Sequence, residues 1–192
     1  QGIILFPEAS FQERDLKEIQ DFIKQYNFSI IGTKSPNKFN STAKKYTQVS
    51  TIISKDDIRI GPVSYPGNLL PLTQMDKFFH GGQYSKLDSM FCKKDKLIDI
   101  QGLKTMIRIC SDVIIPLTDE GKADLILIPS SLSHPHFYME NAIKSLKPSL
   151  NEDAIIMYAT PENVSNQINT GVYDLNIHNI SEDKGHYHIL QR

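Results

Sequence analysis

The chain has 192 residues, of which 40% are hydrophobic and 22% charged, and its formal net charge at neutral pH is -1. These values are typical of a globular domain with a substantial core, and the low net charge gives no signal for binding nucleic acid or an anionic membrane. No apolar stretch approaches the roughly 18 residues that span a bilayer. The 2 cysteines make no disulfide framework, which favours a reducing, cytoplasmic compartment.

The amino-terminal part of the chain predicts a βαβ unit. Residues 2–6 form a continuous apolar run, which predicts a central strand covered on both faces. Ser10 and Glu13 have the spacing of a capping box, and apolar residues recur at helical spacing over residues 11–26. Residues 28–32 predict the next buried strand. A strand, a helix and a strand in close succession indicate a sheet covered by helices.

A hairpin and a long loop are predicted next. Residues 46–54 are rich in β-branched side chains, and with residues 58–60 they predict a hairpin that turns at residues 56–57. Residues 61–95 contain several prolines and glycines and show no periodicity. A loop of this length in a compact domain is typical of an active site, and it contains Lys77.

The carboxyl-terminal half of the chain predicts further strands and one helix. Ala123–Pro129 is a continuous apolar run and predicts a central strand. Residues 136–146 carry apolar residues on one helical face, and Pro148 ends the pattern. The other strands are expected over residues 96–100, 105–110, 153–159, 172–178 and 187–190, the first two joined at Gly102. We find no repeat or domain boundary, so residues 1–192 are expected to form a single domain, excised from or part of a longer polypeptide.

Cys110 lies where the strand over residues 105–110 is expected to end. Sheets of α/β proteins form ligand crevices at the carboxyl ends of their strands, where backbone N–H groups can bind an oxyanion. Each candidate residue also has a plain structural interpretation. Cys110 suits a buried core thiol, Glu8 a carboxylate at a helix entrance, and Lys77 a solvated loop side chain. Cys92 is expected to be an ordinary thiol.

Three features, taken in order, resemble the nitrilase (carbon–nitrogen hydrolase) superfamily. Leu5-Phe6-Pro7-Glu8 matches the family's F-P-E sequence after an apolar strand, and Ile109-Cys110-Ser111-Asp112 matches its I-C-x-D motif. Lys77 lies between them at the family's spacing for a lysine, with Lys86 as its rival. The resemblance covers residues 3–131, including the apolar run that follows the cysteine.

The resemblance implies an α/β fold, a nitrilase-like α-β-β-α sandwich of two mixed β-sheets with outer helices. It also implies that Cys110 is the nucleophile, Glu8 the general base and Lys77 the cation that favours the thiolate. The backbone N–H of Ser111 would help Lys77 to stabilise the oxyanion. The implied activity is hydrolysis or acyl transfer at a non-peptide C–N bond of a small amide or nitrile, through a thioester and without a cofactor. A homo-oligomer is also expected.

A second hypothesis is a catalytically reduced, nitrilase-like module that regulates or assembles an enzyme fused to it outside this chain. The family usually has a second glutamate between its lysine and its cysteine. Between Lys77 and Cys110 the acidic residues of this chain are all aspartates. A metal site at His134 and His136 is disfavoured, because no cysteine or carboxylate cluster accompanies these residues at the spacing of metal ligands.

Overall fold

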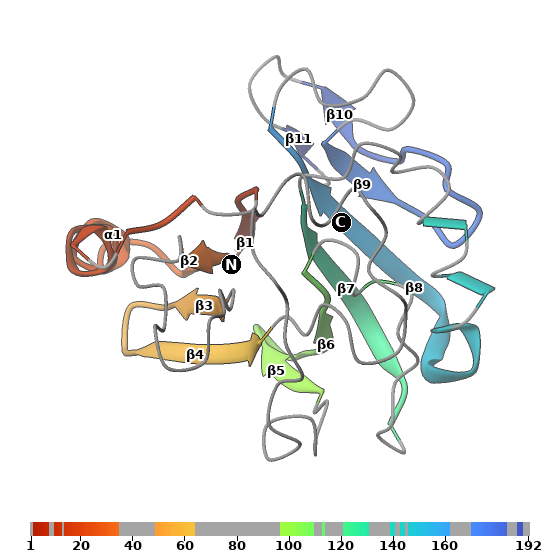
Figure 1. Cartoon of the computed structure of the whole chain (residues 1–192), viewed down its shortest axis with the longest axis horizontal. Coiled ribbons are helices and arrows are strands. Elements are labelled where there is room, and N and C mark those ends of the chain that lie inside the picture. Colours follow the sequence, from red (N-terminus) through yellow and green to blue (C-terminus); the bar gives the residue numbers. More distant parts are fainter. Residues whose placement is uncertain are drawn as a thin grey trace, which may run out of the picture.

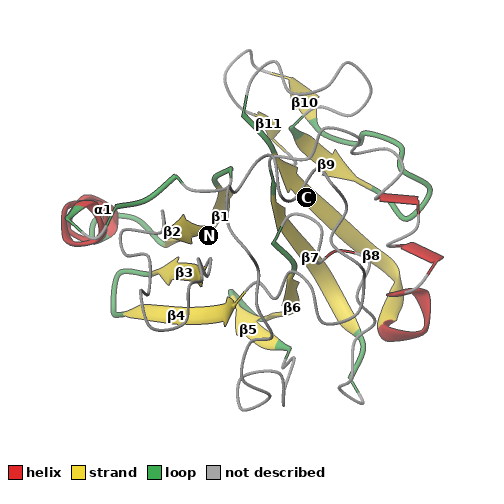
Figure 2. Ribbon diagram, viewed as in Figure 1, coloured by secondary structure: helices red, strands yellow, loops and turns green. Residues whose placement is uncertain are grey.

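The structure is a computed structural model. It describes residues 2–7, 10–12, 14–34, 49–63, 97–109, 113, 121–130, 139–140, 143–144, 146–161, 170–183 and 188–189. Within these residues the chain forms a four-stranded sheet, a five-stranded sheet and a two-stranded sheet (Figures 1 and 2). No helix in this part of the chain is both long enough and apolar enough to cross a membrane.

The four-stranded sheet comes from the amino-terminal part of the chain and has the order β1-β2-β3-β4. β1 pairs with β2 in parallel, and helix α1 connects them, so the predicted βαβ unit is confirmed. β3 and β4 extend the sheet as an antiparallel hairpin, also as predicted. The elements are β1 (Gly2–Leu5), α1 (Asp15–Ile23), β2 (Phe28–Lys34), β3 (Val49–Ile53) and β4 (Ile58–Val63).

The five-stranded sheet has the order β5-β6-β7-β8-β9. Its three middle strands, β6, β7 and β8, are parallel, and the outer strands β5 and β9 run antiparallel to their neighbours. β7 is therefore a central strand, as its apolar sequence predicts. The strands are β5 (Ile98–Ile100), β6 (Leu103–Ile107), β7 (Ala123–Pro129), β8 (Leu150–Ala159) and β9 (Gly171–Tyr173).

The two sheets face each other, and their facing sides form an apolar layer. The buried members of this layer come from β2, β3, β5, β6 and β7, and they are Ile31, Ile52, Ile100, Ile107, Leu125 and Leu127. β1 contacts β7 and β8 across the same layer. The outer face of each sheet is covered by helical residues, so the described layers are in the order helix, sheet, sheet, helix.

The helical cover differs between the two outer faces. On the first sheet, Leu16 and Ile23 of α1 pack with Ile30 and Ile53. On the second sheet, the described residues of the predicted 136–146 helix are helical, at positions 139–140, 143–144 and 146. Met139 and Leu146 in this segment are fully buried with the side chains of β7 and β8.

Three predictions about the elements were wrong. Residues 2–6 do not form a central strand, because β1 lies at the edge of its sheet and pairs only with β2 among the described residues. The predicted capping box does not start the helix: the N-cap of α1 is Arg14, which makes no side-chain capping bond. The hydroxyl of Ser10 instead donates a hydrogen bond to the carbonyl of Pro7.

The third error concerns residues 172–178, where β9 ends at Tyr173. The carboxylate of Asp174 accepts hydrogen bonds from the backbone N–H groups of Asn176 and His178, both at 2.8 Å. These bonds fold the chain into a turn, in which Ile177 has a φ of 63°. The chain then forms β10 (Glu182–Asp183), which pairs with β11 (His188–Ile189).

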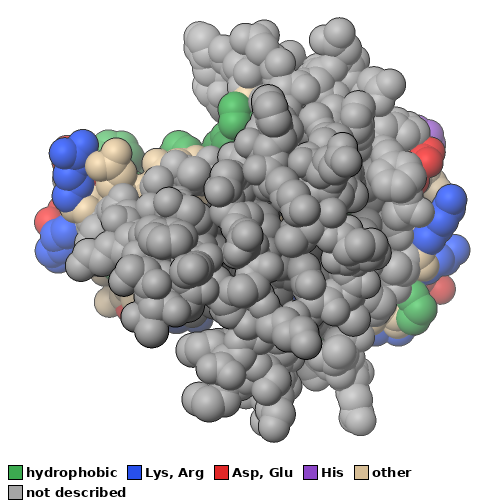
Figure 3. Space-filling view, viewed as in Figure 1, with side chains coloured by type: hydrophobic (Ala, Val, Ile, Leu, Met, Phe, Trp, Pro, Cys, Tyr) green, Lys and Arg blue, Asp and Glu red, His purple; other side chains and the backbone are tan. Residues whose placement is uncertain are grey.

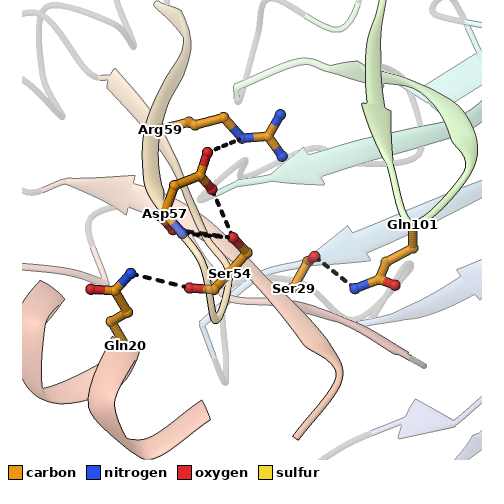
Figure 4. Close-up of polar contacts among 6 residues, drawn as sticks. All are labelled: Gln20, Ser29, Ser54, Asp57, Arg59 and Gln101. Atoms are coloured by element: carbon orange, nitrogen blue, oxygen red, sulfur yellow. Dashed lines mark hydrogen bonds and ion pairs between the residues drawn. The ribbon is translucent and has the colours of Figure 1, made fainter. Parts of the chain in front are cut away.

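Polar contacts connect the layers (Figure 4). The amide of Gln20 in α1 donates to the carbonyl of Ser54 at 3.4 Å, which ties the helix to the end of β3. The amide of Gln101, in the turn between β5 and β6, donates to the hydroxyl of Ser29 in β2 at 3.0 Å. The second contact crosses from one sheet to the other.

Candidate functional site

The predicted site residues Glu8, Lys77, Cys110 and Ser111 lie outside the described residues, as does the rival Lys86. The described residues do include those that flank Glu8 and those that flank Cys110 in the sequence. They therefore show which strands lead to these two positions and how firmly those strands are held.

The chain on both sides of Glu8 is bonded to the end of β2. The N–H of Phe6 donates to the carbonyl of Ile31 at 2.8 Å, which extends the β1–β2 ladder by one residue. Beyond Glu8, the N–H of Phe11 donates to the carbonyl of Thr33 at 3.1 Å. The rings of Phe6 and Phe11 contact each other, with their centroids 5.4 Å apart.

Gly32 makes this attachment possible. A Cβ at position 32 would lie 2.7 Å from the ring of Phe11, which is closer than non-bonded carbon atoms normally approach. Without a side chain at this position, the buried Phe11 ring packs directly on the backbone of β2. Gly32 and Phe11 therefore hold the chain against β2 at residue 11, three residues after Glu8.

The chain around Cys110 is held by the second sheet. The N–H of Arg108 donates to the carbonyl of Leu127 at 2.9 Å, so the β6–β7 ladder continues to two residues before the cysteine. Ile109 and Val113, which flank residues 110–112, are both buried. Both ends of this short segment are therefore anchored in the core.

The hydrogen bond between Ser29 and Gln101 brings the start of β2 next to the turn between β5 and β6. Ser29 is the register partner of Ile3, near the start of β1, and Gln101 lies in the two-residue turn that precedes β6. The starts of β1, β2 and β6 therefore lie together. From these starts, β1 leads toward Glu8 and β6 leads toward Cys110.

Buried polar side chains gather at this carboxyl edge of the five-stranded sheet, and sequence analysis did not select them. Arg108 follows β6 and is 4% exposed, Ser130 follows β7 and is fully buried, and Thr160 follows β8. The hydroxyl of Thr160 has no hydrogen-bond partner among the described groups, whereas its backbone N–H and carbonyl bond the hydroxyl of Thr170. A guanidinium and hydroxyl groups suit an oxyanion or a carboxylate. In the sequence, Arg108 is the one charged residue in the apolar run Met106–Ile109, and this feature could have identified it.

In the part of the chain that the structure describes, no three His, Cys, Asp or Glu side chains are grouped so that they could hold a metal ion. No protein-family model matches the chain, and no curated protein matches it in sequence.

Solved structures do match. The NitFhit protein of C. elegans has a TM-score of 0.55 and 13% identity over 93% of this chain. The fold is nitrilase-like. An amidase from Nesterenkonia sp. has a TM-score of 0.56 and 10% identity, and the NitN amidase of strain AN1 has a TM-score of 0.54 and 10% identity, each over 93% of this chain.

The matched structures are longer than this chain. The similarity covers 49% of the NitFhit chain and 72% and 74% of the two amidase chains. This chain therefore spans about half the length of the NitFhit protein. At 10–13% identity, the similarity shows the fold alone, and it agrees with the predicted α-β-β-α sandwich of two mixed sheets.

Proposed function

We propose that this chain is a carbon–nitrogen hydrolase that acts on small amides or nitriles through Cys110, Glu8 and Lys77. One observation supports the proposal: in a nitrilase-like fold, the Ser29–Gln101 hydrogen bond brings the start of β2 to the turn before β6, from which we infer that the strands leading to Glu8 and to Cys110 end at the same edge. A shared site for a base and a nucleophile requires this arrangement. The two amidases among the similar structures support the same class of reaction.

In the proposed reaction with an amide, Glu8 takes the proton from the thiol of Cys110 while the sulfur attacks the carbonyl carbon. The resulting oxyanion is stabilised by the ammonium of Lys77 and by the backbone N–H of Ser111. Glu8 then gives its proton to the leaving amine as the C–N bond breaks, which leaves a thioester on Cys110. A water molecule, deprotonated by Glu8, attacks the thioester and releases the acid, and the thiol is restored.

Alkylation rates test the proposed roles of Cys110 and Lys77. The reaction of the purified protein with iodoacetamide is followed at each cysteine by peptide mass spectrometry. Cys110 should react faster than Cys92, because a nearby ammonium favours the thiolate. Lys77→Met should slow Cys110 by about tenfold, corresponding to about one unit of thiol pKa, and should leave Cys92 unchanged. Lys86→Met is the matched control and should change neither rate.

Loss of the nucleophile tests the activity itself. Cys110→Ala should abolish the release of ammonia or amine from a panel of small amides, while the melting temperature of the variant shows that the fold remains. Equal alkylation of the two cysteines, with no response to Lys77→Met, would overturn the proposal. Wild-type protein that releases nothing from the panel, together with a silent Cys110→Ala variant, would favour the non-catalytic module.

A further inference from the structure

We propose that Arg108 is a second, buried cation that favours the thiolate of Cys110. It acts through the thiol and does not contact the substrate, so it is a positioning residue for the proposed reaction. The inference rests on the proposed function, in which Cys110 is the nucleophile. The observations that carry it are independent of the family resemblance, because they are the burial of Arg108 and the bonding of the chain beside the cysteine.

Arg108 is the one charged side chain that is buried in the part of the chain that the structure describes. It is 4% exposed, and the Nε and Nη2 atoms of its guanidinium are shielded from solvent. Every other lysine and arginine whose exposure is described lies on the surface. Figure 3 shows side chains of this type at the margins of the visible face. Because burial of a charge is costly, a buried arginine is an unusual choice for an apolar strand.

Arg108 lies on the outer side of the five-stranded sheet, which faces away from the four-stranded sheet. Its N–H donates to the carbonyl of Leu127, which places Arg108 beside Ile128, and Ile128 pairs with Tyr158 on the next strand. Ile128 and Tyr158 belong to the buried cluster on this side, together with Met106. Alternate residues of a strand share a face, so Arg108 follows Met106 to this side. The charge is therefore in surroundings of low polarity.

The sequence limits the separation of Arg108 and Cys110. They are two residues apart, so their Cα atoms are at most about 7 Å from each other in any conformation of the chain. Ile109 between them is buried, and Val113 beyond the cysteine belongs to the same outer cluster as Ile128. The chain is therefore held in the core on both sides of Cys110, close to the buried guanidinium.

A cation at such a separation has a measurable effect on a thiol. With an effective dielectric constant of about 20 and a distance of about 10 Å from charge to sulfur, one positive charge lowers a thiol pKa by about one unit. Burial protects this interaction from screening by salt. An arginine side chain also keeps its charge in a buried site, where a lysine readily loses its own.

The other described charges near Arg108 are weaker candidates. Tyr158 carries no charge at neutral pH, and Glu140 and Lys144, on the helical segment that covers this side, are exposed. Of the described charged residues, Arg108 is the nearest to Cys110 along the chain. The charged residues within β6, β7 and β8 lie at least four residues, or about 13 Å, along the strands from Arg108 and its neighbours, and they are Lys104, Asp124, Glu152 and Asp153.

The pH dependence of alkylation tests the inference. The reaction of Cys110 with iodoacetamide is followed by peptide mass spectrometry from about pH 5 to about pH 10, without substrate. Arg108→Met removes the charge and keeps a long apolar side chain. It should raise the thiol pKa by about one unit, so that Cys110 reacts about tenfold more slowly at low pH. At high pH, where the thiol is ionised in both proteins, the variant should react at least as fast as the wild type.

A change of packing alone is the alternative to be separated. Met106→Ala is the matched control, because it disturbs the same side of the strand without changing a charge. It should lower the melting temperature and leave the thiol pKa of Cys110 unchanged. Arg108→Gln is a second neutral variant, which keeps side-chain hydrogen-bond donors and serves if Arg108→Met does not fold. Glu8, Lys77 and Asp112 are the same in all these proteins, so they do not affect the differences.

Lys77→Met gives a measurement in which Arg108 stays in place. With the loop cation removed, the cation that remains is buried, so the thiol pKa of Cys110 should change little between low and high salt. A rise of this pKa toward the ordinary value of about 8.5 on addition of salt would show that exposed charges hold the thiolate. That result would overturn the inference without any substitution of Arg108.

The outcomes distinguish this inference from the proposed function, because alkylation needs no substrate. An unchanged thiol pKa in a folded Arg108→Met or Arg108→Gln variant would overturn the inference, even if Cys110→Ala abolishes amide hydrolysis. An equal shift in Met106→Ala would also overturn it. A raised pKa in the neutral variants alone would support it. If Cys110→Ala were then silent with every amide, the effect of Arg108 on the thiol would stand and the proposed function would fail.

Discussion

β1 and β7 have the same kind of sequence and very different positions. Both are continuous apolar runs, and both are predicted to be central strands. β7 lies between two parallel neighbours, and its residues Leu125–Pro129 are all buried. β1 has one neighbour among the described strands, and none of its residues is fully buried. An apolar run therefore indicates neither that a strand is fully buried on both faces nor that it has a hydrogen-bonded neighbour on each side.

The largest expected effect contrasts the two strands directly. Leu127→Ala should lower the free energy of unfolding by about 3 kcal/mol, because it opens a cavity in the fully buried layer between the sheets. Ile4→Ala removes a side chain that is 38% exposed and should cost less than about 1 kcal/mol. Urea unfolding measures both values. Similar losses from the two substitutions would mean that β1 is as well covered as β7.

A second prediction concerns the glycine next to β1. Gly32→Ala should lower the free energy of unfolding by about 1–3 kcal/mol, because the new Cβ meets the ring of Phe11 at 2.7 Å. The matched background is Phe11→Leu, which removes the aromatic ring. Adding Gly32→Ala to Phe11→Leu should cost clearly less than adding it to the wild type. An equal cost in both backgrounds would show that the ring is not what excludes a side chain at this position.

Sequence patterns predicted the elements that depend on residues close together in the chain. The helical spacing of apolar residues located α1, and the apolar run at Ala123–Pro129 located β7 and its central place. The edge position of β1 could not be predicted, because strand order depends on contacts between distant segments. The end of β9 was missed because one carboxylate, Asp174, turns the chain inside a stretch that otherwise favours a strand.

The candidate site was predicted by family resemblance rather than by physical pattern. F-P-E and I-C-x-D selected Glu8 and Cys110, and the structure shows that the strands before them start near one another. The roles of Glu8, Lys77, Cys110 and Ser111 stay predictions, because these residues lie outside the described part. Buried Arg108 and Thr160 were not predicted, since the burial of a polar side chain depends on packing that a sequence pattern does not reveal.

A third prediction concerns the hydrogen bond between the four-stranded and the five-stranded sheet. Ser29→Ala and Gln101→Ala each remove one partner of the 3.0 Å hydrogen bond between β2 and the β5–β6 turn. Each should cost about 1 kcal/mol, and the double variant should cost about 1 kcal/mol less than the sum of the single changes. Additive losses in chemical denaturation would show that the two side chains do not interact in solution.

The smallest expected effect lies in the turn after β9. Burial acts to raise the pKa of Asp174, but the hydrogen bonds from His178 and Asn176 outweigh it, so the pKa lies below the ordinary value of 3.8. The stability that comes from this lowered pKa is complete above the unfolded value and is lost as the pH falls through the lower folded value.

Asp174→Asn keeps an acceptor oxygen and cannot titrate in this range. The wild type should exceed this variant in stability by less than about 1 kcal/mol above pH 5, and the difference should shrink toward pH 3. Thermal melts at several pH values measure it. A difference that stays constant over this range would mean that the Asp174 charge does not stabilise the turn.

The turn between β5 and β6 has a consequence for the order of folding. Gln101 and Gly102 both have positive φ angles, 57° and 83°, the combination found in type I′ hairpin turns. A hairpin closed by such a turn needs only local contacts, and hairpins form within about 1–10 μs. The parallel pairs β1–β2 and β7–β8 join segments more distant in sequence and have to close longer loops. We expect the β5–β6 hairpin to form before the parallel pairs. Gln101 would then already be in place when β2 pairs and brings Ser29 within hydrogen-bonding distance.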